Sequence, residues 1–383
     1  MEQQSNRTRR RTARRKSAAV AKAGSGCKRA GAVTLHFSNP DFFPHVSDPF
    51  HLDISAVARA GDDLFLACDE TASVERLSRI DDATFDDQRH FPLSDFFDLP
   101  AGPEAEIDIE GLAIADDCLW IAGSHALKRK KPKREEHASP EALSRMLEIV
   151  REPNRYFLGC VPLEKDGDGR MSLVAKKGGR KARAVKLSKK RSDLIKWLDD
   201  DAHLAPFFDI PSKENGFDIE GLAVHGGRIW LGLRGPVLLG YAVILELELE
   251  PKGKTFKARK IEDGRRYRKH LIDIRGLGVR DLRFDGDDLL VLAGPTMTSD
   301  GPARVYRWKD APANTVSGVV ATPDVTVVTE LPHEHKTDHP EGLELWPEAG
   351  PTGMLVLYDS PAKTRVGPRD FSLTADIFTL SKA

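Results

Sequence analysis

The chain has few cysteines and no long apolar run, and each of these absences argues against a class of protein. Its four cysteines, Cys27, Cys68, Cys118 and Cys160, form no C-x-x-C pair, so we expect no thiolate zinc site and interpret them as reduced residues of a cytoplasmic protein. No apolar stretch among the 383 residues is long enough to span a bilayer. A G-x-S-x-G motif is also missing, which argues against serine hydrolase chemistry.

A short motif returns along the chain. Asp-Ile-Glu-Gly-Leu-Ala occurs at residues 108–113 and again at 218–223, with weaker copies from Asp273 and His339 and a more degenerate copy from Asp53. The starts at 53, 108, 218, 273 and 339 are 55, 110, 55 and 66 residues apart, and each copy leads into an apolar run. Repeats of this length, with short strands and Gly or Asp turns, predict a β-propeller.

We therefore predict an all-β, closed propeller with five blades, and the double-length interval leaves six as the alternative. Within that interval we interpret residues 128–154 and 176–204 as insertions with short helices, since Ser139-Pro140 is typical of a helix start. The insertions should project from the ring. The last blade lacks a fourth strand, so residues 32–38 are expected to pair with 374–380 and close the ring.

The N-terminal segment differs in charge from the rest of the chain. Residues 1–30 contain ten Lys or Arg against one acid, Glu2, whereas the whole chain has a net charge of −1. Such a composition cannot bury a core, so we predict a disordered basic tail ahead of one propeller domain at 31–383. A tail of this kind binds nucleic acid or acidic surfaces with strong salt dependence. A purely solubilising leader is the alternative.

The third positions of the motif copies are Ser55, Glu110, Glu220, Arg275 and Glu341. Ring symmetry brings equivalent positions together, so three carboxylates should converge on the axis. Such a cluster must bind a cation, pair with Arg275 or hold protons through raised pKa values. Carboxylate oxygens suit Ca²⁺ or another divalent cation, which makes the three glutamates candidate metal ligands. The alternative is that motif residues only bond loop amides where each blade starts.

Residues that do not repeat are better candidates for a specific role. The second strand of each predicted blade ends on the face where the motifs begin. At these strand ends, His125 is a candidate general acid or base, and Arg234 is a candidate for binding a carboxylate or phosphate group. A lone His or Arg in a loop is more often structural. The candidate ligand-binding residues of this face are Lys213, Asn215, Arg275, Asp69 and Asp359.

The repeated motif, Leu-Trp-Ile-Ala-Gly-Ser-His at 119–125 and Ser-Lys-Glu-Asn-Gly-Phe-Asp-Ile-Glu-Gly-Leu at 212–222 resemble the bacterial domain of unknown function 3616 family, over residues 35–380. The resemblance implies a β-propeller and no established activity. The Glu-Gly-Leu blade starts are also faintly similar to those of phytase-like and gluconolactonase-like propeller hydrolases, some of which hold a divalent cation on the axis. Arg275 departs from an all-carboxylate ring.

These observations lead to two expectations about function. The first is a propeller that binds a small anionic ligand, such as a phosphate ester, at the axial face and hydrolyses it with the help of a metal ion. The second is a non-catalytic scaffold that presents this face to a protein, while the basic tail contacts nucleic acid or acidic surfaces. The sequence leaves open whether the protein is an enzyme and in which oligomeric state it exists.

Overall fold

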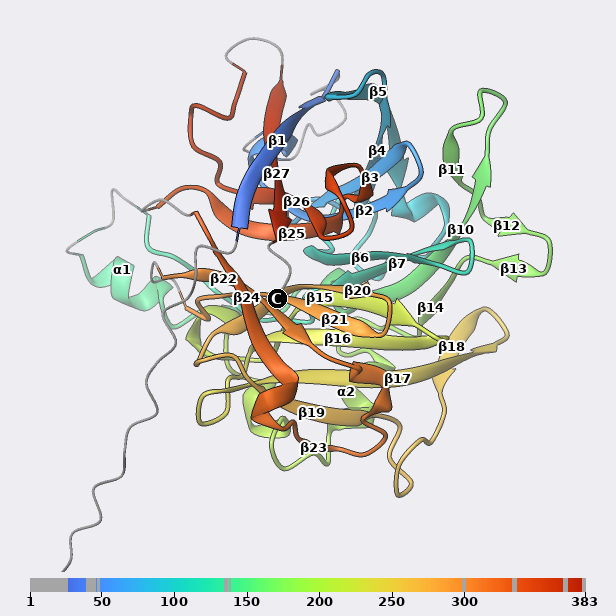
Figure 1. Cartoon of the computed structure of the whole chain (residues 1–383). Coiled ribbons are helices and arrows are strands. Elements are labelled where there is room, and N and C mark those ends of the chain that lie inside the picture. The colour runs from blue at the N-terminus through green and yellow to red at the C-terminus, as the bar shows by residue number, and fades with distance from the viewer. Residues whose placement is uncertain are drawn as a thin grey trace, which may run out of the picture.

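β-Strands are the main secondary structure of the chain, with only two short α-helices in the described residues, which confirms the all-β prediction. The computed structural model describes residues 27–38, 46, 49–133, 137, 139–297, 301–332, 336–367 and 371–380. Figure 1 shows successive sheets with two short helices, α1 (Pro140–Arg145) and α2 (Asp193–Leu198). No helix in the described residues is long and apolar enough to cross a membrane.

The longer strands form antiparallel groups of four, in which each strand pairs with the next. The groups are β2 (Ile54–Ala60), β3 (Asp63–Cys68), β4 (Ser73–Arg79) and β5 (Thr84–Pro92); β6 (Ile109–Ala115), β7 (Cys118–Gly123), β10 (Leu158–Lys165) and β14 (Arg183–Val185); β15 (Asp218–His225), β16 (Arg228–Gly235), β17 (Tyr241–Lys252) and β19 (Arg268–Asp273); β20 (Gly278–Asp285), β21 (Asp288–Gly294), β22 (Ala303–Trp308) and β24 (Val325–Leu331); and β25 (His339–Leu345), β26 (Gly353–Asp359), β27 (Ser372–Leu380) and β1 (Cys27–His36).

The remaining strands lie beside these groups or form separate two-stranded sheets. They are β8 (Lys128–Arg129), which pairs with β9 (Ile149–Val150); β11 (Met171–Leu173), which pairs with β10; the hairpin of β12 (Lys176–Lys177) and β13 (Arg180–Lys181); β18 (Thr255–Ala258), which pairs with β17 and β14; and β23 (Gly318–Val319), which pairs with β19.

The first strand of each group faces the centre of the molecule, and we call β2, β6, β15, β20 and β25 the inner strands. Each inner strand contacts the next along the chain, and β25 contacts β2, so the contacts form a closed cycle. The apolar core follows the same order. Each buried hydrophobic cluster draws its residues from two neighbouring groups, and one of them joins the group of β25 to the group of β2.

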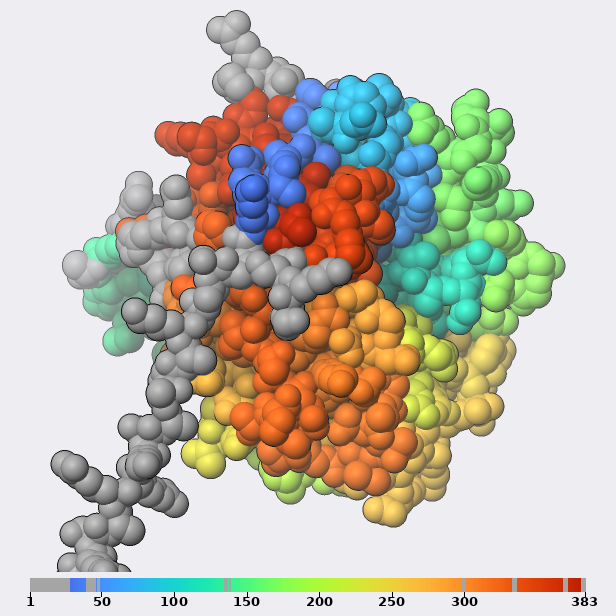
Figure 2. Space-filling model, viewed as in Figure 1, coloured from blue at the N-terminus to red at the C-terminus, as the bar shows by residue number. Residues whose placement is uncertain are grey.

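The two ends of the described chain lie together, as the sequence predicts. β1 pairs with β27 in antiparallel register, with Thr34 opposite Thr374, and Figure 2 shows the blue atoms of β1 beside the red atoms of the C-terminal strand. β1 begins at Cys27, so the predicted tail boundary at residue 30 is wrong: residues 27–30 gain a strand partner in β27. Residues 1–26 lie outside the described residues.

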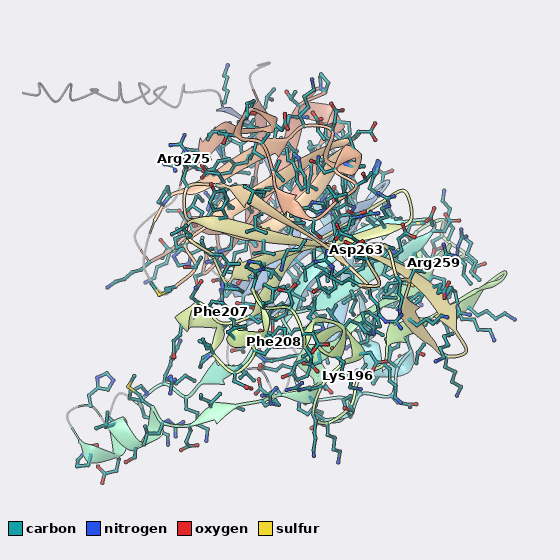
Figure 3. All side chains as sticks on the ribbon, turned by 90° about the horizontal axis from the view of Figure 1, so that it is seen from below. Lys196, Phe207, Phe208, Arg259, Asp263 and Arg275 are labelled. Carbon is teal, nitrogen blue, oxygen red and sulfur yellow. The ribbon has the colours of Figure 1, made fainter. Side chains whose placement is uncertain are left out.

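The two predicted insertions behave differently. In the first, Ser139 caps α1 through its side chain as predicted, and no α1 side chain is buried; Figure 3 shows this arm standing away from the sheets. In the second, only β12 and β13 are a peripheral hairpin. β14 is the fourth strand of its group, and α2 buries Leu194 and Leu198. The expectation that all of 176–204 projects is wrong, because its apolar residues complete the core.

Candidate functional site

The inner strands carry a β-bulge at equivalent places. In each of them the pairing with the following strand skips one residue, and a bulge of this kind re-aims the side chain of the skipped residue. The skipped residues are Ser55, Glu110, Glu220, Arg280 and Glu341. The three motif glutamates thus occupy equivalent positions, as the repeat predicts.

The glycine after the bulge allows neighbouring inner strands to approach closely. A Cβ at Gly111 would lie 2.5 Å from the Cβ of Leu222, and one at Gly221 would lie 2.8 Å from Cγ of Leu282. Both distances are too short for real side chains, so the Glu-Gly pair combines a re-aimed carboxylate with tight packing of the strands.

Arg275 is not the fourth member of this ring, and that prediction is wrong. Arg275 is exposed and has a φ of 61° in the turn after β19, and Figure 3 shows it at the edge of the molecule. The equivalent residue is Arg280, five positions later, at the bulge of β20. The motif-like letters at 273–277 belong to the end of one group rather than to the start of the next.

Arginines link the carboxylates around the centre. Arg234, at the end of β16, contacts Asp218 at 2.6 Å and also Glu220. Arg280 contacts Glu220 at 3.0 Å and also Glu341. Because a single guanidinium serves two carboxylates each time, these side chains form one continuous chain of charges.

Further acids border this chain of charges. Asp108 is paired with Arg155 at 2.6 Å, and Asp359 lies 3.8 Å from the His339 ring. The negative charges of Asp108, Asp359 and Glu341 act on the carboxyl group of Asp69. We call the whole set the axial mouth; it consists of Asp69, Asp108, Glu110, Arg155, Asp218, Glu220, Arg234, Arg280, His339, Glu341 and Asp359.

The axial mouth has an excess of acid, with seven carboxyl groups against three guanidinium groups and one imidazole. Burial raises the pKa of Glu110 well above its usual value, and the nearby Glu220 and Asp108 raise it further. Burial likewise raises the pKa of Asp69, with Asp108 and Asp359 adding to the effect. Burial raises the pKa of Asp218 to about 7, although Arg234 opposes the shift.

The mouth is open to water on one side and closed on the other. Glu110, Glu341 and Asp69 keep part of their surface exposed. Deeper along the inner strands, the buried guanidinium of Arg283 donates hydrogen bonds to backbone carbonyls of β2, β6 and β25. A side chain that fills the centre in this way forms a floor. Sequence reasoning missed Arg283, which belongs to no motif.

The other predicted site residues lie in different environments. His125 is buried, its Nδ1 lies 2.9 Å from the Gly123 carbonyl oxygen, and burial lowers its pKa to about 4. Its Nε2 has no hydrogen-bond partner in the described part of the chain. Asn215 pins its loop by accepting a hydrogen bond of 2.9 Å from the Val237 amide, and Lys213 is exposed. Direct roles for these residues stay predictions.

The three motif glutamates stay predicted metal ligands, and two of them share an arginine. Arg280 contacts both Glu220 and Glu341, and a guanidinium between two carboxylates takes the position that a shared cation would need. Among the residues that the structure describes, no three His, Cys, Asp or Glu side chains are arranged to hold a metal ion.

The fold and the axial mouth define a propeller-like protein with a polar, acid-rich centre. The chain belongs to the family described as "Protein of unknown function (DUF3616)", whose model matches residues 53–376. This confirms the resemblance seen in the sequence. No curated protein matches the chain.

Solved structures resemble the chain only distantly. Kuenenia stuttgartiensis hydrazine synthase is 9% identical over 82% of this chain and 57% of its own chain, with a TM-score of 0.34. Streptogramin B lyase is 8% identical over 91% and 98% of the two chains, with a TM-score of 0.34. The PQQ-bound aldose sugar dehydrogenase from Streptomyces coelicolor is 11% identical over 92% and 98%, with a TM-score of 0.33. Likenesses at this level carry no argument about function.

Proposed function

We propose that the axial mouth binds a small ligand that carries positive charge or several hydrogen-bond donors, such as an amine. The proposal rests on the lack of direct bonding partners at Asp69 and Glu110. Neither has a hydrogen bond or ion pair among the described residues, and Asp69 Oδ1 is buried. A carboxyl group that is desolvated, flanked by other carboxylates and without a direct ion pair favours a cationic or donating partner.

The expected anionic ligand is less well supported by the charges. All three arginines of the mouth, Arg155, Arg234 and Arg280, are already bonded to carboxylates. Each of these arginines is largely buried and contacts at least two carboxylates, so a phosphate ester would have to displace those partners and would then face the remaining acids. An anion would therefore bind at a net electrostatic cost.

The mouth also suits proton transfer. Burial raises the pKa of Glu110 well above its usual value, whereas Arg234 and Arg280 oppose the effect of burial at Glu220. Two neighbouring carboxyl groups whose surroundings differ in this way can serve as acid and base. We propose that any catalysis uses Glu110 as the proton donor to a bound ligand. Assistance by a metal ion would require that other acids of the mouth bind it, because Arg280 already contacts Glu220 and Glu341.

We further propose that the groups of strands form the blades of a five-bladed propeller. The closed cycle of contacts among the inner strands supports this number, as does the alternation of hydrophobic clusters between neighbouring groups. The double-length interval of the sequence is then filled by the α1 arm and by the segment that contains β14 and α2.

A thermal-shift screen at pH 7 tests the ligand proposal. The probes are alkylamines, amino sugars and polyamines, with CaCl₂, MgCl₂ and MnCl₂ as a second series. We expect at least one amine to raise the melting temperature through binding to the folded state, and Glu110→Gln and Asp69→Asn to abolish the shift. Asp263→Asn is the control, because the side chain of Asp263 is 90% exposed. Stabilisation by phosphate esters alone, lost in Glu110→Gln, would contradict the proposal.

The scaffold alternative is supported by one observation. Several large apolar side chains of the α1 arm are exposed. Single exposed apolar residues are common on protein surfaces, whereas a cluster of them marks an interaction surface. The exposed residues of the arm are Leu143, Met146, Leu147 and Ile149, with 70%, 44%, 77% and 44% of their surface exposed. Of the basic tail predicted at 1–30 and expected to contact nucleic acid, residues 1–26 lie outside the described residues.

A further inference from the structure

A cavity with charged residues in its walls lies away from the axial mouth, where β1 and β27 pair. It has a volume of about 490 Å³, which is within the range of small-molecule sites. β1, β24, β27 and the connection before β27 supply its walls. The lining residues are Arg29, Glu330, Pro332, Thr364, Arg365, Thr374, Asp376 and Phe378.

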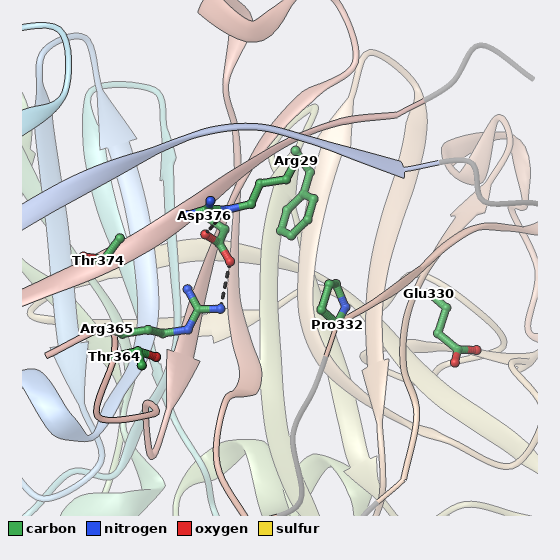
Figure 4. Close-up of a pocket in the computed structure, with 8 residues that line it drawn as sticks. Arg29, Glu330, Pro332, Thr364, Arg365, Thr374 and Asp376 are labelled. Carbon is green, nitrogen blue, oxygen red and sulfur yellow. Dashed lines mark hydrogen bonds and ion pairs between the residues drawn. The ribbon is translucent and has the colours of Figure 1, made fainter.

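Two arginines of this cavity converge on one carboxylate. Arg29 Nε lies 2.7 Å from Asp376 Oδ1 and Arg365 Nη2 lies 2.8 Å from Oδ2, and Figure 4 shows them approaching from two sides. Tyr358 donates a third hydrogen bond of 3.0 Å to Oδ2. The Arg365 guanidinium stacks over the Tyr358 ring at 3.9 Å. Asp376 is thus saturated and fixes the orientation of both arginines.

Both guanidinium groups keep donors that no described residue uses. Each arginine carries five N–H groups. Arg29 uses one on Asp376 and is 58% exposed, and Arg365 forms ion pairs with Asp376 at 2.8 Å and with Asp338, which lies 2.9 Å from its Nε. The second acid of the cavity, Glu330, is paired with Arg304 at 2.9 Å. These contacts leave further N–H groups of both arginines available to a ligand.

We propose that this cavity binds a small oxyanion, either a free phosphate or the phosphate or carboxylate group of a small molecule, which Arg29 and Arg365 hold together. Planar guanidinium groups with several N–H donors match such anions well. The hydroxyl of Thr374 adds a neutral donor on the same wall. The anionic ligand expected from the sequence then belongs here and not at the axial mouth.

Binding in this cavity also strengthens the closure of the molecule. Arg29 belongs to β1, whereas Arg365 precedes β27 and Asp376 lies within it. An anion that bonds to both arginines joins the N-terminal strand to the C-terminal strand from the side. Because the site is complete only when β1 and β27 are paired, bound anion should stabilise the folded state.

The test measures binding of inorganic phosphate and glycerol 3-phosphate by thermal shift and by ³¹P NMR at constant ionic strength, with glycerol as the uncharged control. We expect both anions to bind saturably and glycerol not to bind. Arg29→Gln should weaken anion binding at least tenfold. Arg259→Gln is the matched control, because Arg259 is 60% exposed and its Nε also contacts a carboxylate, that of Glu250, at 2.9 Å.

A second variant keeps the test decisive if Arg29→Gln disturbs the closure. Thr374→Val preserves the shape of the strand residue and removes only a hydroxyl, so it should fold normally and bind phosphate more weakly. Glu110→Gln in the axial mouth should leave phosphate binding unchanged. The proposal is overturned if neither anion binds saturably, if Arg29→Gln and Arg259→Gln behave alike, or if Thr374→Val binds as the wild type does.

Discussion

At the scale of single residues, Arg283 joins the inner strands from inside the ring. Its guanidinium donates hydrogen bonds of 2.9, 3.1 and 2.9 Å to the carbonyls of Val57, Leu112 and Leu343. Arg283→Met keeps a similar volume but removes these donors and leaves the buried Asp281 without its cation. We expect the free energy of unfolding to fall by about 3–5 kcal/mol, measured by urea titration.

Arg307 provides the matched control for this prediction. It also contacts two carboxylates, Asp285 at 2.9 Å and Asp288 at 2.8 Å, but it is partly exposed. Arg307→Met should cost only about 1 kcal/mol or less, since water replaces the lost partner. Equal losses in the two variants would show that Arg283 does not hold the strands together.

The sequence motif predicted which glutamates occupy equivalent positions on the inner strands, but it predicted the wrong arginine. Asp-Ile-Arg-Gly-Leu matches the motif in letters, yet it forms the turn after β19. The spacing to the next strand is the better signal. Glu110 precedes Leu119, the start of the next apolar run, by nine residues, and nine residues before Leu289 stands Arg280 rather than Arg275. Burial of the cluster depends on contacts between distant strands, which the sequence does not specify.

At the scale of elements, the α1 arm is an addition that the fold does not require. The strands β8 and β9 close its base, and none of the α1 side chains is buried. Replacing residues 131–147 by an Asn-Gly turn should change the free energy of unfolding by about 0.5 kcal/mol or less in chemical denaturation. Leu198→Ala in α2 is the contrasting variant and should cost about 2–5 kcal/mol, because Leu198 is fully buried. A large loss on removing the arm would contradict its peripheral role.

Local signals predicted the helices of both insertions but not their packing. Ser139 followed by Pro140 specifies the start of α1 by capping and backbone geometry, and the structure places α1 there. The apolar residues of α2 pack against the core, whereas those near α1 remain exposed. A short apolar stripe has the same pattern in both cases. Only the position of neighbouring strands decides whether it is covered.

At the scale of the whole molecule, closure was predictable because it follows from counting strands. A last group with one strand too few and an N-terminal strand without a group can complete each other, and β1 pairs with β27 accordingly. The acid excess of the axial mouth is a property of the same closed arrangement. It exists only when the inner strands surround a common centre, so the stability of the molecule is linked to the ionisation of these acids.

This linkage gives the whole protein a stability optimum below neutral pH. Asp218 and Asp281 have folded pKa values raised to about 7, so their contribution is fully present below their unfolded pKa of about 3.9 and is lost as pH rises through 7. Glu106 has a pKa lowered to about 2, so its contribution is lost as pH falls below its unfolded value. The melting temperature should therefore peak near pH 5 and decline towards pH 8.

A variant of the mouth should reduce that decline. Glu110→Gln removes a carboxyl group whose ionisation is opposed by burial and by the neighbouring acids. It should raise the free energy of unfolding at pH 8 and change it little at pH 4, since each unit by which the folded pKa exceeds the unfolded one corresponds to about 1.4 kcal/mol. Scanning calorimetry from pH 4 to 8 measures the slopes of the variant and the wild type, and Asp263→Asn, an exposed carboxyl group, should follow the wild type. A wild-type melting temperature that rises from pH 5 to 8 would mean that the arginines fully compensate the acids of the mouth.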